Sequence, residues 1–131
     1  MTRDEIMKLT PDELRAEIAK RRGYELKHGF LDEVCINPKD YWVTPAGRLT
    51  SVLPDWTTDI AAAWELVEEM ITPKDESLAA ILASHRPYII WNGEDWIYLV
   101  SGDESDEQVA RGTTLPLAIS RAWLIWKTEA K

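Results

Sequence analysis

The chain has 131 residues, 45% of them hydrophobic and 29% charged, and carries a formal net charge of −8. Its length and composition match a single globular domain and exclude a disordered or fibrous protein. The negative charge repels phosphate backbones, so sequence-independent nucleic-acid binding is not expected.

The sequence also indicates the cellular compartment in which we expect the protein. No stretch reaches the roughly 20 apolar residues that cross a bilayer, and the polar first residues do not resemble a signal peptide. Cys35 is the single cysteine, which rules out an intramolecular disulfide and suits a reducing compartment. We therefore expect a cytoplasmic protein that makes no membrane contact. The sequence is compatible with a homo-oligomer.

Two helices are predicted at the start of the chain. Thr2 is suited to cap a short helix over residues 3–8. Thr10 and Glu13 have the spacing of a capping box for a second helix, which extends to residue 22. Gly23 is expected to end it, because glycine readily adopts the left-handed conformation found after helices.

Residues 24–56 are rich in turn-forming residues. Short β-type runs at 33–36 and 41–43 are interpreted as strands of one sheet. The turn signals between them come from asparagine, proline and glycine.

A third helix is predicted over residues 60–71 from apolar residues three and four positions apart. Further helical turns are expected over 75–84. We predict that the tryptophans on helical stripes lie in the core, namely Trp64 and, further along, Trp123 and Trp126. Trp42 and Trp56 lie in turn-rich segments and are expected to be more exposed.

The last third of the chain predicts a hairpin and a helix. Aromatic and β-branched runs at 88–91 and 96–100 flank an Asn-Gly turn, which is a strong hairpin signal. Residues 101–108 are interpreted as an acidic loop. An apolar stripe over 115–129 predicts the most buried helix. Together these elements favour an α+β fold, a single small domain over 1–131 with helices packed on a mostly antiparallel sheet.

Four segments, at 1–7, 9–15, 53–65 and 114–122, resemble the phage ABA sandwich domain family. The resemblance implies a small protein encoded by a bacteriophage or prophage, with two helices packed against a central sheet. It supplies no catalytic residues. Ser120 stands at a position where this family commonly has a cysteine.

Catalytic and metal motifs are absent from the sequence. A nucleophilic Cys35 would need a histidine base, and neither His28 nor His85 has a local signature beside it. These three residues also lack the spacing of a zinc site, so neither a metal nor a cofactor is predicted. Acid–base carboxylate pairs stay open, because such partners meet in space rather than in sequence.

The start of the last helix is the most specific candidate for a binding site. Arg111, Gly112, Thr113 and Thr114 combine an arginine, a glycine and two hydroxyls before a first turn without a carboxylate. Such a helix start suits a phosphate or carboxylate. Simple capping by Thr113 or Thr114 explains the same residues.

Tryptophans near this start offer a surface for a flat ligand. Trp91 and Trp96 flank the hairpin turn, where their rings either pair across the strands or hold a ligand. The full predicted ligand-binding set is Arg111, Gly112, Thr113, Thr114, Trp56, Trp91 and Arg121.

Three functions follow as hypotheses. The first is a non-enzymatic phage accessory protein that binds a small anionic or nucleotide-like ligand and sequesters a host-defence signal. The second is an acidic inhibitor that binds a basic host protein in the manner of a DNA mimic, motivated by the acidic run at 103–107. The third is a small phosphodiesterase-like enzyme.

Overall fold

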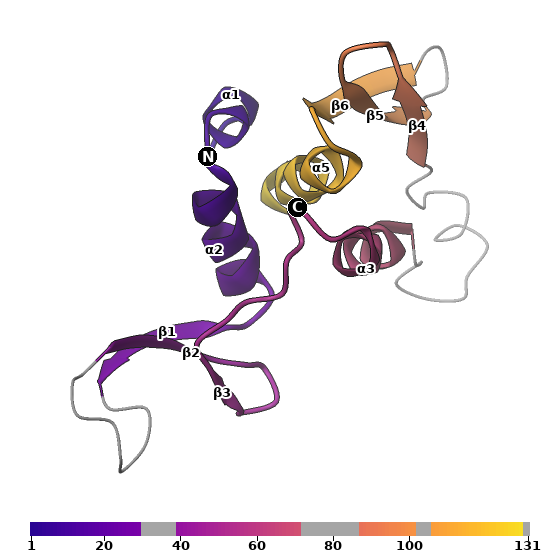
Figure 1. The fold of residues 1–131 in the computed structure, drawn as a ribbon. Coiled ribbons are helices and arrows are strands. Elements are labelled where there is room, and N and C mark those ends of the chain that lie inside the picture. Colours follow the sequence, from indigo (N-terminus) through magenta and orange to yellow (C-terminus); the bar gives the residue numbers. More distant parts are fainter. Residues whose placement is uncertain (30–38, 72–86, 102–105, 130–131) are drawn as a thin grey trace.

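The computed structural model describes residues 1–29, 39–71, 87–101 and 106–129 (Figure 1). This part of the chain forms four helices and two three-stranded antiparallel sheets, so the predicted α+β fold class is confirmed. The elements in chain order are α1 (Arg3–Met7), α2 (Pro11–Arg21), β1 (Glu25–Gly29), β2 (Lys39–Val43), β3 (Leu49–Thr50), α3 (Ile60–Ile71), β4 (Pro87–Trp91), β5 (Trp96–Ser101), β6 (Asp106–Gly112) and α5 (Leu115–Glu129).

The ends of the first two helices follow the predicted chemistry. Thr2 and Thr10 each form a complete capping box, with Glu5 and Glu13 as the reciprocal partners. After α2, Gly23 has a φ of 94°. The amides of Gly23 and of the residue after it then bond back to two of the last carbonyls of the helix. Local sequence therefore sets where both helices start and where α2 stops.

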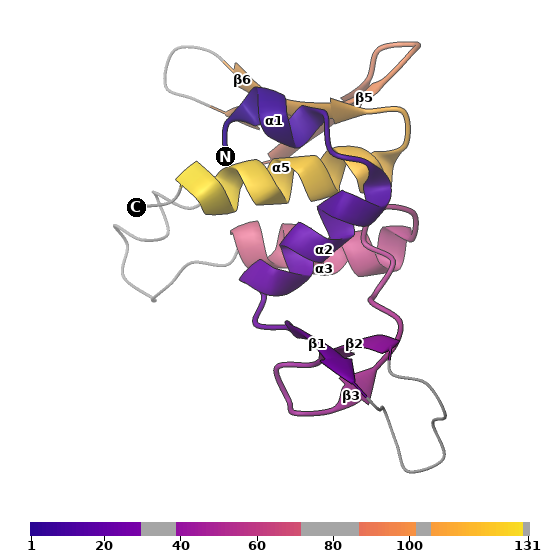
Figure 2. The same cartoon turned by 90° about the vertical axis from the view of Figure 1, so that its left-hand side faces the viewer.

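The strands form two separate sheets rather than the single sheet that was predicted. One has the order β1-β2-β3 and the other β4-β5-β6. Figures 1 and 2 show them at opposite ends of the molecule, with the helices between them. Most of β1 is exposed, so the first sheet adds little to the core. The strand expected at 33–36 and the helical turns expected at 75–84 lie outside the described residues.

The strand β6 corrects the predicted loop over 101–108, since residues 106–112 pair with β5. Its acidic first residues have low β propensity, and pairing with an aromatic and β-branched neighbour overrides that preference. This strand is the feature that positions the candidate site, because it leads directly into α5.

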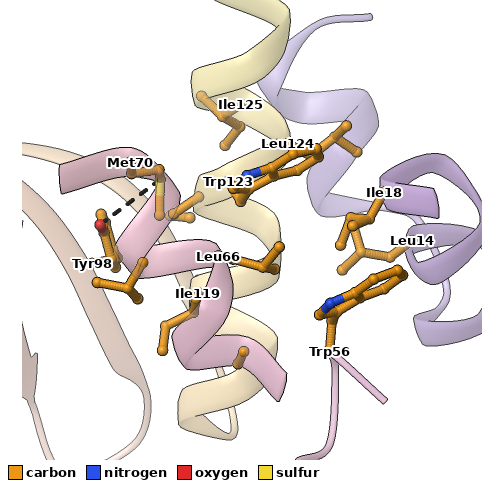
Figure 3. Close-up of a cluster of buried hydrophobic side chains, with 14 of the residues drawn as sticks. Leu14, Ile18, Trp56, Leu66, Met70, Tyr98, Ile119, Trp123, Leu124 and Ile125 are labelled. Carbon is orange, nitrogen blue, oxygen red and sulfur yellow. Dashed lines mark hydrogen bonds between the residues drawn. The ribbon is translucent and has the colours of Figure 1, made fainter. Parts of the chain in front are cut away.

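The core is built around α5, which lies centrally between the other helices and below the β4-β5-β6 sheet in Figure 1. Its buried side chains include Ile119, Trp123 and Leu124, as the sequence predicted for the most buried helix. Figure 3 shows side chains of α2, α3 and β5 around it. The Tyr98 hydroxyl lies 3.9 Å from the Met70 sulfur.

The tryptophans divide differently from the prediction. Trp123 is fully buried as expected, but Trp56 is also 0% exposed, so the prediction of an exposed Trp56 was wrong. Trp64 is 45% exposed although it lies on the apolar stripe of α3, so its predicted core position was wrong as well. Trp42 and Trp126 are half-buried.

Candidate functional site

A row of three residues crosses the end of the second sheet. In the β4–β5 ladder Trp91 pairs with Trp96, and in the β5–β6 ladder Trp96 pairs with Gly112. Directly paired residues point to the same face of a sheet. The two indole rings therefore lie on the face of Gly112, with their centroids 5.5 Å apart and their planes at 50°. Trp91 is 50% exposed.

Gly112 allows β6 and α5 to approach closely. A Cβ atom at this position would lie 2.8 Å from the backbone nitrogen of Ala118. This is closer than real Cβ contacts, so only glycine fits without a shift of backbone. The predicted close-approach role of Gly112 is thus explained by packing of strand against helix, without any ligand.

The side chain of Arg121 contacts the backbone of Arg111 at this junction of β6 and α5. The Nη1 group of Arg121 donates a hydrogen bond of 2.9 Å to the carbonyl oxygen of Arg111. The Arg111 guanidinium lies 3.9 Å from a carboxylate oxygen of Asp95 and donates to the side chain of Gln108 at 3.3 Å. Asp95 thus lies near the Arg111 guanidinium, and its charge also acts on Arg121.

Arg121 is held in a partly desolvated position. Burial lowers the pKa of its guanidinium, and the charge of Asp95 acts in the opposite direction. Its Nε atom is buried and has no hydrogen-bond partner among the described residues. A buried donor left without an acceptor is costly, so an acceptor bound here would relieve that cost.

The first turn of α5 is partly capped. The Thr114 hydroxyl accepts a long hydrogen bond of 3.4 Å from the Leu117 amide. Pro116 removes one amide from the turn, and no acidic residue occupies it. Thr113 and Thr114 are both exposed. The helix start therefore keeps its favourable field for an anion, with fewer free amides than an ideal anion site.

One predicted residue lies elsewhere. The ring of Trp56 packs beside Leu14 and Ile18 of α2 (Figure 3) and makes an edge contact with Tyr24 at 5.9 Å. It is fully buried and offers no surface to a ligand. The structure thus brings Arg111, Gly112, Thr113, Thr114 and Arg121 together at the junction. Trp91 lies on the sheet face of Gly112, opposite to that of the Arg111 side chain, and Trp56 is separate from them as a core residue.

Asp95 and Gln108 are the members of this group that the sequence did not predict. Both act on the arginines, the first by charge and the second by a hydrogen bond. Knowledge of the β5–β6 register, which pairs Arg111 with Ile97, could have identified them, because it sets which residues lie near Arg111. That register could not be inferred while 101–108 was interpreted as a loop.

Metal ligands do not cluster in the described part of the chain, where no three His, Cys, Asp or Glu residues come together. His28 lies 2.7 Å from Asp40, across the exposed β1–β2 ladder. Cys35 and His85 fall outside the described residues. In residues 1–29, 39–71, 87–101 and 106–129 there is also no helix with the length and apolar character needed to span a bilayer.

The chain matches no known protein family, no curated protein and no solved structure in the comparisons made with each. Its function is therefore inferred from the described residues themselves.

Proposed function

We propose that this protein binds a small anionic, nucleotide-like ligand at the junction of β6 and α5 without transforming it. The observation that carries the proposal is the contact of the Arg121 guanidinium with the backbone carbonyl of Arg111, at a helix start that has no carboxylate in its first turn. An arginine offers several donors in a planar fork, which suits phosphate and carboxylate oxygens. The exposed Trp91 ring, on the sheet face of Gly112, would stack on a flat base.

The biological role that we propose rests on the resemblance to the phage ABA sandwich domain family. A phage accessory protein that binds a nucleotide signal in the host cytoplasm would lower the free concentration of that signal. Such sequestration needs binding alone, which fits a site built from positive charge and an aromatic surface. A phosphodiesterase-like activity is the outcome to be excluded by product analysis.

Thermal shift with a panel of cyclic and ADP-ribose-type nucleotides tests the proposal. A ligand that binds only the native state stabilises it by about 2.7 kcal/mol at one hundred times its Kd. We expect a shift for one class of nucleotide that disappears in the variants Arg111→Gln and Arg121→Gln. Arg48→Gln is the matched control, because it removes one exposed positive charge at a distant turn.

A matched pair of variants tests the contribution of the exposed Trp91 ring. Trp91 and Trp64 are 50% and 45% exposed, on β4 and α3 respectively. Trp91→Ala should weaken nucleotide binding, whereas Trp64→Ala should not. The proposal fails if no nucleotide shifts the melting temperature at millimolar concentration, or if the shift survives in the Arg111→Gln/Arg121→Gln double variant.

A second candidate function, an acidic inhibitor of a basic host protein, is favoured by the outer face of α3. Ile60 and Trp64 are 46% and 45% exposed and lie one helical turn apart. Glu65 and Glu68 lie on the exposed side of the same helix. Large exposed apolar side chains beside acidic ones suit a partner with a basic surface. The acidic run at 103–107 that first suggested this function lies mostly outside the described residues.

Retention of a purified basic host enzyme tests this second function. Binding should weaken as salt rises, because screening acts on charges that stay exposed to solvent. It should also be reduced by Trp64→Ala and unaffected by Trp91→Ala, the reverse of the pattern expected for nucleotide binding. Equal retention of the two variants at low salt would reject the α3 face as the interface.

A further inference from the structure

The edge strands of the two sheets differ in how they are protected. In the described part of the chain the edges are β1 and β3 in the first sheet and β4 and β6 in the second (Figure 1). An edge strand has unpaired backbone groups, and proteins protect such edges with charged residues, β-bulges or very short strands. β1 carries charged residues, and β3 has only two residues. β6 carries charged residues, and its pairing with β5 shifts register between Tyr98 and Leu99. Each of these three edges is therefore protected.

The strand β4 lacks this protection. Its sequence, Pro-Tyr-Ile-Ile-Trp, contains no charged residue. Tyr88, Ile90 and Trp91 are 54%, 38% and 50% exposed. Tyr88 and Ile90 point to one face of the sheet, because alternate residues of a strand do so, whereas Ile89 points to the other face and packs against the core. Among the described residues β4 thus forms an apolar edge without charge, which is typical of a strand that pairs with another chain.

The backbone groups that face this free edge follow from the hairpin. The Asn92 amide donates to the Asp95 carbonyl at 3.1 Å, so these two residues form a hydrogen-bonded pair next to the β4–β5 ladder. Hydrogen-bonded and non-hydrogen-bonded pairs alternate along antiparallel strands. Every second residue of β4, namely Trp91, Ile89 and Pro87, therefore has its backbone groups directed away from β5, toward the free edge.

We infer that β4 pairs antiparallel with β4 of a second copy of this chain, across a two-fold axis beside Ile89. In this register the amide and carbonyl of each Ile89 bond to those of its counterpart, and each Trp91 amide donates to the Pro87 carbonyl of the other copy. Proline has no amide, so Pro87 leaves no donor unsatisfied in the pairing. Tyr88 lies opposite Ile90 of the other copy, and aromatic and β-branched residues form favourable cross-strand pairs.

Charge and symmetry favour a second copy as the occupant of this edge. Each chain has a formal net charge of −8, so two copies repel each other over most of their surfaces. An edge without charged residues lets two copies approach without opposed like charges, whereas it offers a basic partner no attraction. A two-fold contact needs a surface that is complementary to itself, and the donors and acceptors of β4 meet this condition. The pairing needs only the backbone of Trp91, so it does not depend on the proposed function.

Sedimentation velocity from micromolar to millimolar concentration tests the inference. β4 has five residues, compared with about 20–30 on each side of a standard interface, so we expect a dimer that dissociates on dilution. Ile90→Lys should raise the Kd of the dimer about tenfold, because it replaces both of the Tyr88–Ile90 cross-strand pairs. Ile60→Lys is the matched control, since Ile60 is 46% exposed on α3. A monomer at millimolar concentration, or equal effects of the two variants, would overturn the inference.

Disulfide cross-linking tests the register, in a Cys35→Ser background that removes the single native cysteine. Directly opposite residues lie about 4.5–5.5 Å apart, within reach of a disulfide, whereas diagonal neighbours lie about 7–8 Å apart. A mixture of Tyr88→Cys and Ile90→Cys chains should therefore cross-link under mild oxidation, and each variant alone should do so far more slowly. No cross-link in the mixture, or one that forms as fast in either variant alone, would overturn the proposed pairing.

Discussion

The buried hydroxyl of Ser120 donates a hydrogen bond of 2.7 Å to the backbone carbonyl of Trp56. Ser120 is 0% exposed, and the two residues are 64 positions apart. This bond ties α5 to the turn that leads into α3. The serine thus satisfies a backbone carbonyl inside the core.

Replacement of Ser120 by alanine should therefore destabilise the protein. The carbonyl of Trp56 would lose its donor, and a buried group left unsatisfied costs about 1–3 kcal/mol. Urea denaturation should show a lower midpoint with an unchanged slope. Thr128→Ala is the control in the same helix, because its hydroxyl donates only to carbonyls of α5 itself. Equal losses for both variants would show that the Trp56 contact is not special.

Gly112→Ala should force β6 away from the first turns of α5. The new Cβ atom would meet the Ala118 backbone at 2.8 Å, and backbone cannot move aside as a flexible side chain can. We expect a loss of about 1–3 kcal/mol, as for other overpacked sites. Gly29→Ala is the control, because a Cβ atom there would have no neighbour within 4 Å. A melting temperature unchanged from wild type would contradict the close approach.

Trp56→Ala and Trp64→Ala should differ strongly in stability. Trp56 is fully buried, and the loss of such a ring costs about 3–5 kcal/mol through lost burial and the cavity that remains. Trp64 is 45% exposed, and its removal should change the free energy of unfolding by about 1 kcal/mol or less. Chemical denaturation of both variants decides the point. Equal costs would place Trp64 back in the core.

The burial of Tyr98 predicts that the protein loses stability at alkaline pH. Burial raises the pKa of its hydroxyl well above the ordinary value of a tyrosine. The unfolded chain releases this proton near pH 10, which the folded protein resists, so the contribution is present below that pH and is lost as the pH rises further. Tyr98→Phe should make stability fall less steeply above pH 10 in urea titrations, while Tyr88→Phe, at an exposed position, should not.

Local signals in the sequence predicted most of the helical framework. Capping boxes at Thr2 and Thr10, and the glycine after α2, act over a few residues and are read without knowledge of the fold. The hairpin turn is another such case. The Asn92 side chain accepts from the amides of Glu94 and Asp95, and Gly93 has a φ of 98°.

Features that depend on distant partners could not be predicted in the same way. The carboxylate of Asp55 pairs with Arg15 of α2, a partner 40 positions away, whereas the nearby Asp59 caps α3. Trp64 follows the apolar period of its helix. That period does not indicate how much of the apolar face of α3 is covered by the elements that pack against the helix.

The candidate site was predicted only in part, because some of its residues come together through pairing of distant segments. Arg111 to Thr114 are adjacent in sequence, so their grouping needed only the start of α5. Asp95 comes close to them because β5 pairs with β6. The sequence did not predict this pairing, because the polar composition of β6 suggested a loop. Trp56 was assigned to the site because a turn-rich segment suggested exposure, whereas the turn directs its ring into the core.

The central position of α5 has a consequence for synthesis on the ribosome. This helix provides the surface on which α1, α2, α3 and the β5–β6 strands pack, and Arg3 pairs with Glu129 at 2.7 Å across 126 positions. Chains are made from the N-terminus, so the earlier elements emerge before the helix that they need to bury their apolar sides. Nascent chains that end before residue 115 should remain exposed to proteases and chaperones until translation continues through α5.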